Sequence, residues 1–143
     1  MTTLTIDGRE HSLRHLWLPE MSLSSARAGR HAATYVLAVD RNTVLSSLAD
    51  AYEQYVREMK EDDELTGETD ALGQAGYPPL AAVLDDPALL SEALGGYGLS
   101  DELFRAVLPP ASGQMLGTWA IDTVDSVRRE GERIVFQGTC YAF

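Results

Sequence analysis

The stretch from Asn42 to Asp70 constrains the fold most, because a helical apolar stripe runs directly into a dense acidic segment. Between Asn42 and Lys60, apolar residues recur every three or four positions, which places them on one side of a helix with 3.6 residues per turn. The stripe consists of Leu45, Leu48, Tyr52, Val56 and Met59. The pattern predicts one long amphipathic helix, with Asp40 or Asn42 positioned to cap its start.

An acidic run follows this helix. Its carboxylates are Glu61, Asp62, Asp63, Glu64, Glu68 and Asp70. Negative charges near a helix C-terminus oppose the helix dipole. We therefore expect the helix to fray near Lys60 and the run to form a solvated loop.

Strand patterns lie on both sides of this helical middle. Residues 2–6 and 9–18 predict a hairpin, because Asp7-Gly8 suits a two-residue type I′ turn with positive φ. Residues 32–40 predict an interior strand that leads into the long helix, and residues 115–143 predict a hairpin that turns near Glu130-Gly131. The sequence thus indicates a single α+β domain over residues 1–143 with one antiparallel sheet.

Helix signals between residues 78 and 110 complete this fold prediction. Pro79, Asp86-Pro87 and Ser100 mark the starts of three short helices, the second of which we expect to end at Gly95. We expect the one long and about three short helices to pack on one face of the sheet.

The net charge of −11 lies almost entirely in the middle third of the chain. Residues 50–102 contain two basic and fourteen acidic residues, whereas the segments on either side are close to neutral. Nucleic acid is an unsuitable partner, because binding it requires Lys and Arg against the phosphates. A basic protein surface is the partner that this charge favours.

The location that we expect is the cytoplasm. No apolar stretch is long enough to span a bilayer, and the first residues lack the pattern of a signal peptide. The single cysteine, Cys140, excludes an intrachain disulfide, which fits a reducing compartment. We expect no membrane partner.

No residue pattern predicts catalysis, a metal site or a cofactor. His11 and His15 would lie about 13 Å apart on a strand, too far to share one ion, and we interpret them and His31 as structural. Cys140 lies in an apolar strand, where we expect a buried core residue. The GGYG segment at residues 95–98 has no lysine for a phosphate, so we interpret it as a helix end.

The acidic run also fails as a calcium loop. Aligned from Asp62 to Gly73, it places acids at several ligand positions of an EF-hand. The twelfth position, which requires a bidentate glutamate, is Gly73. The run is therefore either a contact surface for a protein or only a solvated face.

We expect the partner-binding residues to be the acids around this run together with two nearby tyrosines, since tyrosine is favoured as an interface anchor. These residues are Glu58, Glu61, Asp62, Asp63, Glu64, Glu68, Asp70, Tyr77 and Tyr97.

In general build, the chain resembles the small acidic bacterial immunity proteins of polymorphic-toxin systems. The resemblance is carried by the acidic run and by the closing hairpin, with Gly117-x-Trp119 and Phe136-x-Gly138-x-Cys140-Tyr141. It implies a protein that is not an enzyme and that inhibits a toxin by covering its basic surface. A DNA-mimicking anti-restriction or anti-CRISPR protein is a variant of this hypothesis.

Two other hypotheses stay open. The chain could be a small enzyme or ligand-binding domain with a pocket between sheet and helices, using His15, Glu20, His31 or Tyr35. It could also be a subunit of a larger assembly, which would require a more apolar interface.

Overall fold

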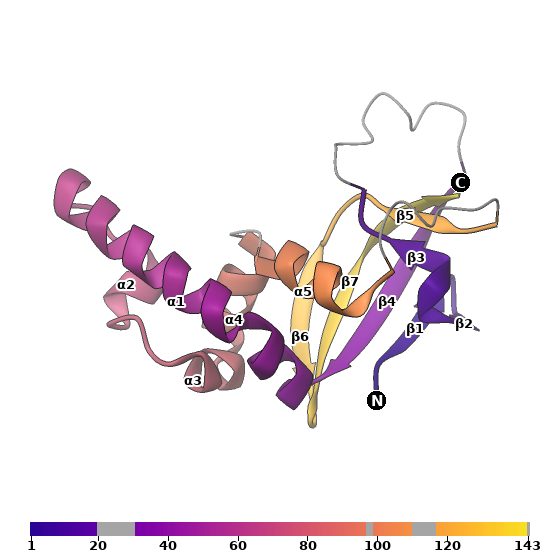
Figure 1. Cartoon of the computed structure of the whole chain (residues 1–143), viewed down its shortest axis with the longest axis horizontal. Coiled ribbons are helices and arrows are strands. Elements are labelled where there is room, and N and C mark those ends of the chain that lie inside the picture. The colour runs from indigo at the N-terminus through magenta and orange to yellow at the C-terminus, as the bar shows by residue number, and fades with distance from the viewer. Residues whose placement is uncertain (20–30, 97–98, 110–116, 143) are drawn as a thin grey trace.

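The computed structural model describes residues 1–19, 31–96, 99–109 and 117–142. In these ranges the predicted α+β class is confirmed: a curled, mostly antiparallel sheet stands beside a group of helices, one of them long (Figure 1). The strands are β1 (Thr3–Ile6), β2 (Arg9–His11), β3 (Leu16–Trp17), β4 (Ala32–Asp40), β5 (Trp119–Ile121), β6 (Ser126–Glu130) and β7 (Arg133–Ala142). The helices are α1 (Arg41–Thr66), α2 (Ala71–Gln74), α3 (Leu80–Asp85), α4 (Pro87–Ser91) and α5 (Leu99–Val107).

The sheet has the order β2-β1-β4-β7-β5-β3, and β6 also pairs with β7. β4 and β7 form its centre and are paired along their whole length, with Tyr35 opposite Gly138. The predicted interior strand at residues 32–40 is confirmed. The expectation of a purely antiparallel sheet is wrong, because β3 pairs with β5 in parallel, with Leu16 opposite Trp119.

The predicted type I′ turn is confirmed, since both Asp7 and Gly8 have positive φ, 49° and 80°. The predicted second strand, residues 9–18, is wrong in its length. β2 ends at His11, a 3₁₀ turn follows at Leu13–His15, and β3 then leaves the hairpin to join β5. A longer second strand could not stay paired, because its partner β1 is only four residues long.

The short helices begin largely where proline and aspartate signals predict. The Asp86 carboxylate accepts hydrogen bonds from the N–H groups of Ala88 and Leu89, at 3.0 and 3.2 Å, and Pro87 takes the first helical position. The expected end at Gly95 does not match the end of this helix: α4 ends at Ser91, and the chain continues as a π-helical segment, Glu92–Gly96. Ser100 is not a cap, because it lies inside α5 and is buried.

The expectation that the long helix frays near Lys60 is wrong, because α1 continues through Glu61–Asp63 to Thr66. Gly67 ends it with φ 72°, and its N–H donates to the carbonyl of Asp63 at 2.8 Å. Each exposed charge opposes the helix dipole by only about 0.3–1 kcal/mol. A glycine cap and continued backbone hydrogen bonding outweigh that cost.

One face of the sheet forms the core with the helices. Tyr35, Leu37 and Val39 alternate toward it from β4, and Ile134 and Phe136 do so from β7. α1 supplies buried Val44, Leu48 and Tyr52, all in its first half. Its second half projects beyond the sheet with α2 beside it (Figure 1). No helix in the described ranges is long and apolar enough to cross a membrane.

Candidate protein-binding surface

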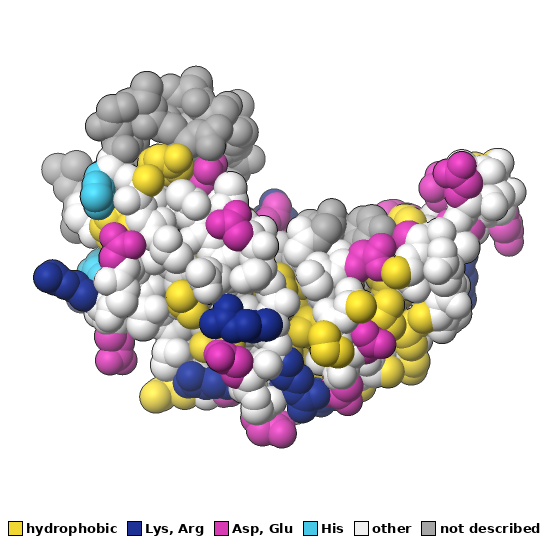
Figure 2. Space-filling model, turned by 180° about the vertical axis from the view of Figure 1, so that it is seen from behind, with side chains coloured by type: hydrophobic (Ala, Val, Ile, Leu, Met, Phe, Trp, Pro, Cys, Tyr) yellow, Lys and Arg dark blue, Asp and Glu magenta, His cyan; other side chains and the backbone are white. Residues whose placement is uncertain are grey.

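The projecting end of α1 carries a face on which three acids precede an exposed leucine. Leu65 is 86% exposed, and Asp62, Glu61 and Glu58 precede it by three, four and seven residues. Residues at these spacings are neighbours on one side of a helix. We call this set, Glu58, Glu61, Asp62 and Leu65, the Leu65 face. Figure 2 shows the acidic side chains that gather at this end of the molecule.

The charge at this end is not neutralised internally. Among the described residues, no ion pair involves the carboxylates of Glu61, Asp62, Glu64 or Glu68, and all four side chains are exposed. Glu64 directly precedes Leu65 and so lies about 100° around the helix from it, and Glu68 follows the glycine cap. These carboxylates are therefore available to an external cation.

Two of the predicted contact acids hold the local structure instead. Asp70 caps α2, where its Oδ1 accepts from the N–H of Gly73 at 2.9 Å. Asp63 accepts a hydrogen bond from the hydroxyl of Tyr77. Both side chains are half-buried. The structure thus separates Asp63 and Asp70 from the exposed acids of the same run.

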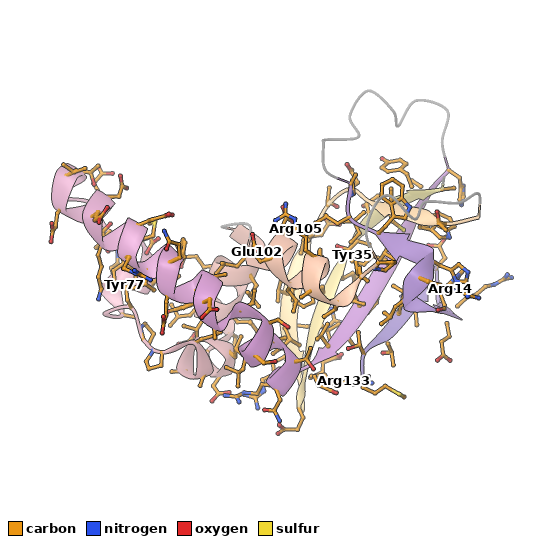
Figure 3. All side chains as sticks on the ribbon, in the orientation of Figure 1. Arg14, Tyr35, Tyr77, Glu102, Arg105 and Arg133 are labelled. Carbon is orange, nitrogen blue, oxygen red and sulfur yellow. The ribbon has the colours of Figure 1, made fainter. Side chains whose placement is uncertain are left out.

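Tyr77 is a brace rather than a free aromatic anchor. It belongs to the segment that follows α2, and its side chain contacts α1 (Figure 3), with its ring 5.8 Å from Lys60 Nζ and its hydroxyl on Asp63. Its φ is 50°, an unusual value for a non-glycine residue. Burial, followed by the hydrogen bond to Asp63, raises the pKa of Tyr77 to about 12. The other predicted anchor, Tyr97, lies outside the described residues.

Beside this brace lies a groove of about 490 Å³ between α1 and the Tyr77–Leu80 segment. Its walls are mostly apolar, and Glu53 and Arg57 are the charged residues among them. The lining residues are Leu45, Ala49, Tyr52, Glu53, Val56, Arg57, Tyr77, Pro78, Pro79 and Leu80. Figure 2 shows apolar side chains exposed over this helical half of the molecule.

The described polar residues that were considered for an enzyme pocket, Tyr35, His31 and His15, each contact a different residue. The Tyr35 hydroxyl donates to the carbonyl of Thr123 at 2.7 Å, and burial raises the pKa of Tyr35. His31 is exposed and its ring lies 6.0 Å from that of Trp119, while His15 lies against His11. Glu20 lies outside the described residues. The groove is formed by α1 and the Tyr77–Leu80 segment, not by these groups.

The expected separation of His11 and His15 is wrong. Their ring centroids are 5.9 Å apart, because the 3₁₀ turn at Leu13–His15 folds the chain back where a continuous strand would have kept them apart. In the part of the chain that the structure describes, no cluster of three or more His, Cys, Asp or Glu side chains could hold a metal ion. Cys140 is fully buried, as predicted, and burial raises the pKa of its thiol to about 12.

Leu65 and most of the groove were absent from the predicted site. Because the helix was expected to end near Lys60, residues 61–65 were not treated as helical, and the spacing that places Leu65 beside Glu61 and Asp62 was not considered. Pro78 and Pro79 gave a usable signal, since consecutive prolines after a helix predict a rigid extended segment. Its position against α1 depends on tertiary packing.

Comparison with known proteins found no match: no family model, no curated protein and no solved structure matches the chain. The functional argument therefore depends on the surface itself.

Proposed function

We propose that this chain is an acidic binding protein that inhibits a basic protein by covering its surface, and that the target is a bacterial toxin for which the chain is the immunity protein. The observation that supports this most is the set of exposed, unpaired carboxylates at the projecting end of α1, two of which, Glu61 and Asp62, lie beside Leu65 on the Leu65 face. The narrower assignment to immunity proteins depends on the resemblance described above.

The arrangement suits the task in two ways. Unpaired carboxylates attract a basic surface over roughly a Debye length of about 8 Å at physiological salt and accelerate encounter. Burying Leu65 would then stabilise the complex by about 1.5–3 kcal/mol, the value of a fully buried leucine side chain. Both contributions come from a helix end that reaches away from the sheet.

The first test is to identify the partner. The chain is used as bait in lysate of its native host at low and at high salt, and bound proteins are identified by mass spectrometry. We expect a stoichiometric basic protein that is lost at high salt. Retention through high salt would indicate a permanent, apolar interface instead.

The second test measures association with that partner. Neutralising the tip with Glu61→Gln, Asp62→Asn, Glu64→Gln and Glu68→Gln should slow association by roughly ten-fold or more at low salt. Asp63 and Asp70 are retained because they hold the local structure. A matched control removes four exposed carboxylates elsewhere: Glu10→Gln, Asp50→Asn, Asp101→Asn and Asp125→Asn. Equal slowing by both sets would show that net charge alone matters, and no effect of the tip set would refute the proposal.

A further inference from the structure

The projecting end of α1, residues 57–66, lies beyond the hydrophobic core. Tyr52 is the last buried residue of the helix, and Val56 is the last whose side chain packs against the core. None of residues 57–66 is buried, and this end stands clear of the sheet (Figure 1). A helical segment shorter than about 12–15 residues is only marginally stable in water without tertiary packing. The helical state of this end therefore depends on local contacts.

Like charges oppose the helix at this end. Glu58 and Asp62 are four residues apart, and Glu61 and Glu64 are three apart. Side chains at these spacings are neighbours on a helix, where equal charges are destabilising. Among the described residues none of the four carboxylates has an ion-pair partner, and all of them lie in the C-terminal part of α1, where they oppose the helix dipole. Electrostatic repulsion therefore favours the unfolded segment, in which the charges can move apart.

The side chain of Tyr77 holds this end of the helix in place (Figure 3). Its hydroxyl donates to Asp63, and its ring lies 5.8 Å from Lys60 Nζ. In the described part of the chain, no ion pair and no other side-chain hydrogen bond joins residues 57–66 to a segment outside α1 and its cap. The support of this end by the rest of the fold is thus concentrated in one residue.

The backbone of Tyr77 is fixed on the core side of this contact. Its N–H donates to the carbonyl of Leu72 at 2.9 Å, and Leu72 is fully buried. The carbonyl of the next residue, Pro78, accepts a hydrogen bond from the hydroxyl of Tyr52. An anchored residue and a weakly held helix end meet at the Tyr77–Asp63 hydrogen bond, so this bond is where the two can separate.

We propose that the projecting end of α1 is an order–disorder element: residues 57–66 unfold locally while the sheet and the first half of α1 stay folded, and the Tyr77–Asp63 hydrogen bond limits this opening. Glu61, Asp62 and Leu65 share one side of the helix only while the helix is formed, so opening disperses the Leu65 face. The consequence rests on the proposed function. A partner that binds the Leu65 face selects the helical state, and its apparent affinity falls with the fraction of chains in that state.

Hydrogen exchange of the free chain, followed by NMR at low concentrations of urea, measures this opening. We expect the amides of residues 62–66 to exchange at rates that do not change with urea, because a local opening exposes little surface. Residues 35–38 of β4, which are paired with strands on both sides, should exchange at least roughly a hundred-fold more slowly and respond to urea. The same urea dependence at both sets of amides would overturn the inference.

Two substitutions separate the local transition from the global one. Tyr77→Phe removes the hydroxyl that contacts Asp63, so residues 62–66 should exchange about five-fold faster. Ile134→Val shortens a fully buried side chain of β7 and should accelerate residues 35–38 by about five-fold, leaving residues 62–66 within about two-fold of the parent. Circular dichroism establishes that both variants are folded. Equal acceleration of both sets by Ile134→Val, or unchanged exchange of residues 62–66 in folded Tyr77→Phe, would overturn the inference.

The complex with the cognate partner tests the consequence. Residues 62–66 should exchange at least about ten-fold more slowly in the complex than in the free chain, because the partner binds only the helical state. If these residues open locally in the free chain but exchange equally fast in the complex, the local opening stands and the Leu65 face is not the contact surface. If they are protected in the complex but exchange in the free chain only together with residues 35–38, the inference is wrong and the proposed function stands.

Discussion

The hydroxyl of Tyr35 reaches the backbone carbonyl of Thr123, at 2.7 Å, across a position where β7 has only a glycine. A Cβ atom on Gly138 would lie 1.9 Å from that carbonyl oxygen and 2.9 Å from the hydroxyl. The hydrogen bond ties the central strand β4 to the loop between β5 and β6 over the middle of β7. Gly138 is thus required by packing rather than by its backbone angles.

Gly138→Ala should destabilise the fold by about 3 kcal/mol, because backbone atoms cannot move aside as a flexible side chain could. Urea unfolding followed by circular dichroism measures this change. Gly95→Ala is the matched control: its Cβ would meet only Val127 Cγ2, at 3.7 Å, an ordinary contact. That variant should be neutral or slightly stabilising. Equal effects at the two glycines would show that the close approach at Gly138 is unimportant.

Tyr77→Phe should loosen the end of α1 by removing the hydrogen bond to Asp63. We expect a loss of about 1 kcal/mol and faster hydrogen exchange in the last turn of the helix. The pKa of Tyr77 is raised from 10.0 to about 12, so the folded state holds the phenol proton more tightly than the unfolded state. The protonated Tyr77 phenol therefore stabilises the fold fully below pH 10, and this stabilisation is lost as the pH rises to about 12.

Ultraviolet titration of the phenols tests this assignment directly. The parent should contain one phenol with a midpoint near pH 12 that Tyr77→Phe lacks. Loss of a phenol that titrates near 10 would instead place the Tyr77 hydroxyl in water, and its role as a brace would be refuted.

Gly67→Ala should shorten α1, because Gly67 has φ 72°, a left-handed conformation that disfavours a side chain by about 1–2 kcal/mol. The expected result is reduced helical ellipticity and faster exchange of the amides from Glu64 to Gly67. Gly67→Asn should have a smaller effect, since asparagine tolerates this conformation better. If Gly67→Ala leaves exchange unchanged, the acidic run is not held as helix by this cap.

Local sequence signals predicted much of the fold. The Asp7-Gly8 turn, the strand at residues 32–40 and the Asp86-Pro87 cap each depend on a few neighbouring residues, and each is confirmed. The burial of Cys140, predicted from the apolar strand around it, is confirmed as well.

The remaining features depend on distant contacts or on a balance of small energies. The parallel pair of β3 and β5 joins two short strands about a hundred residues apart, so no local pattern announces it. The end of α1 depends on whether the Gly67 cap and the Tyr77 hydrogen bond to Asp63 outweigh the repulsion between the acids. The repulsion can be predicted from the sequence, but the contact of Tyr77 with α1 cannot. For the same reason the predicted site contained Asp63 and Asp70 but omitted Leu65.

Leu65→Ser separates binding from folding at the proposed contact. Leu65 is 86% exposed, so the substitution should change the free energy of unfolding by less than about 0.5 kcal/mol. If the leucine is buried by the partner, losing its transfer energy of about 1.5–3 kcal/mol weakens affinity by roughly ten-fold or more. Leu65→Met should retain most of the affinity, because methionine has a similar volume and is also apolar. Calorimetric titration with the purified partner measures all three affinities, and a serine variant that binds like the parent would remove Leu65 from the interface while leaving the carboxylates around it to be tested separately.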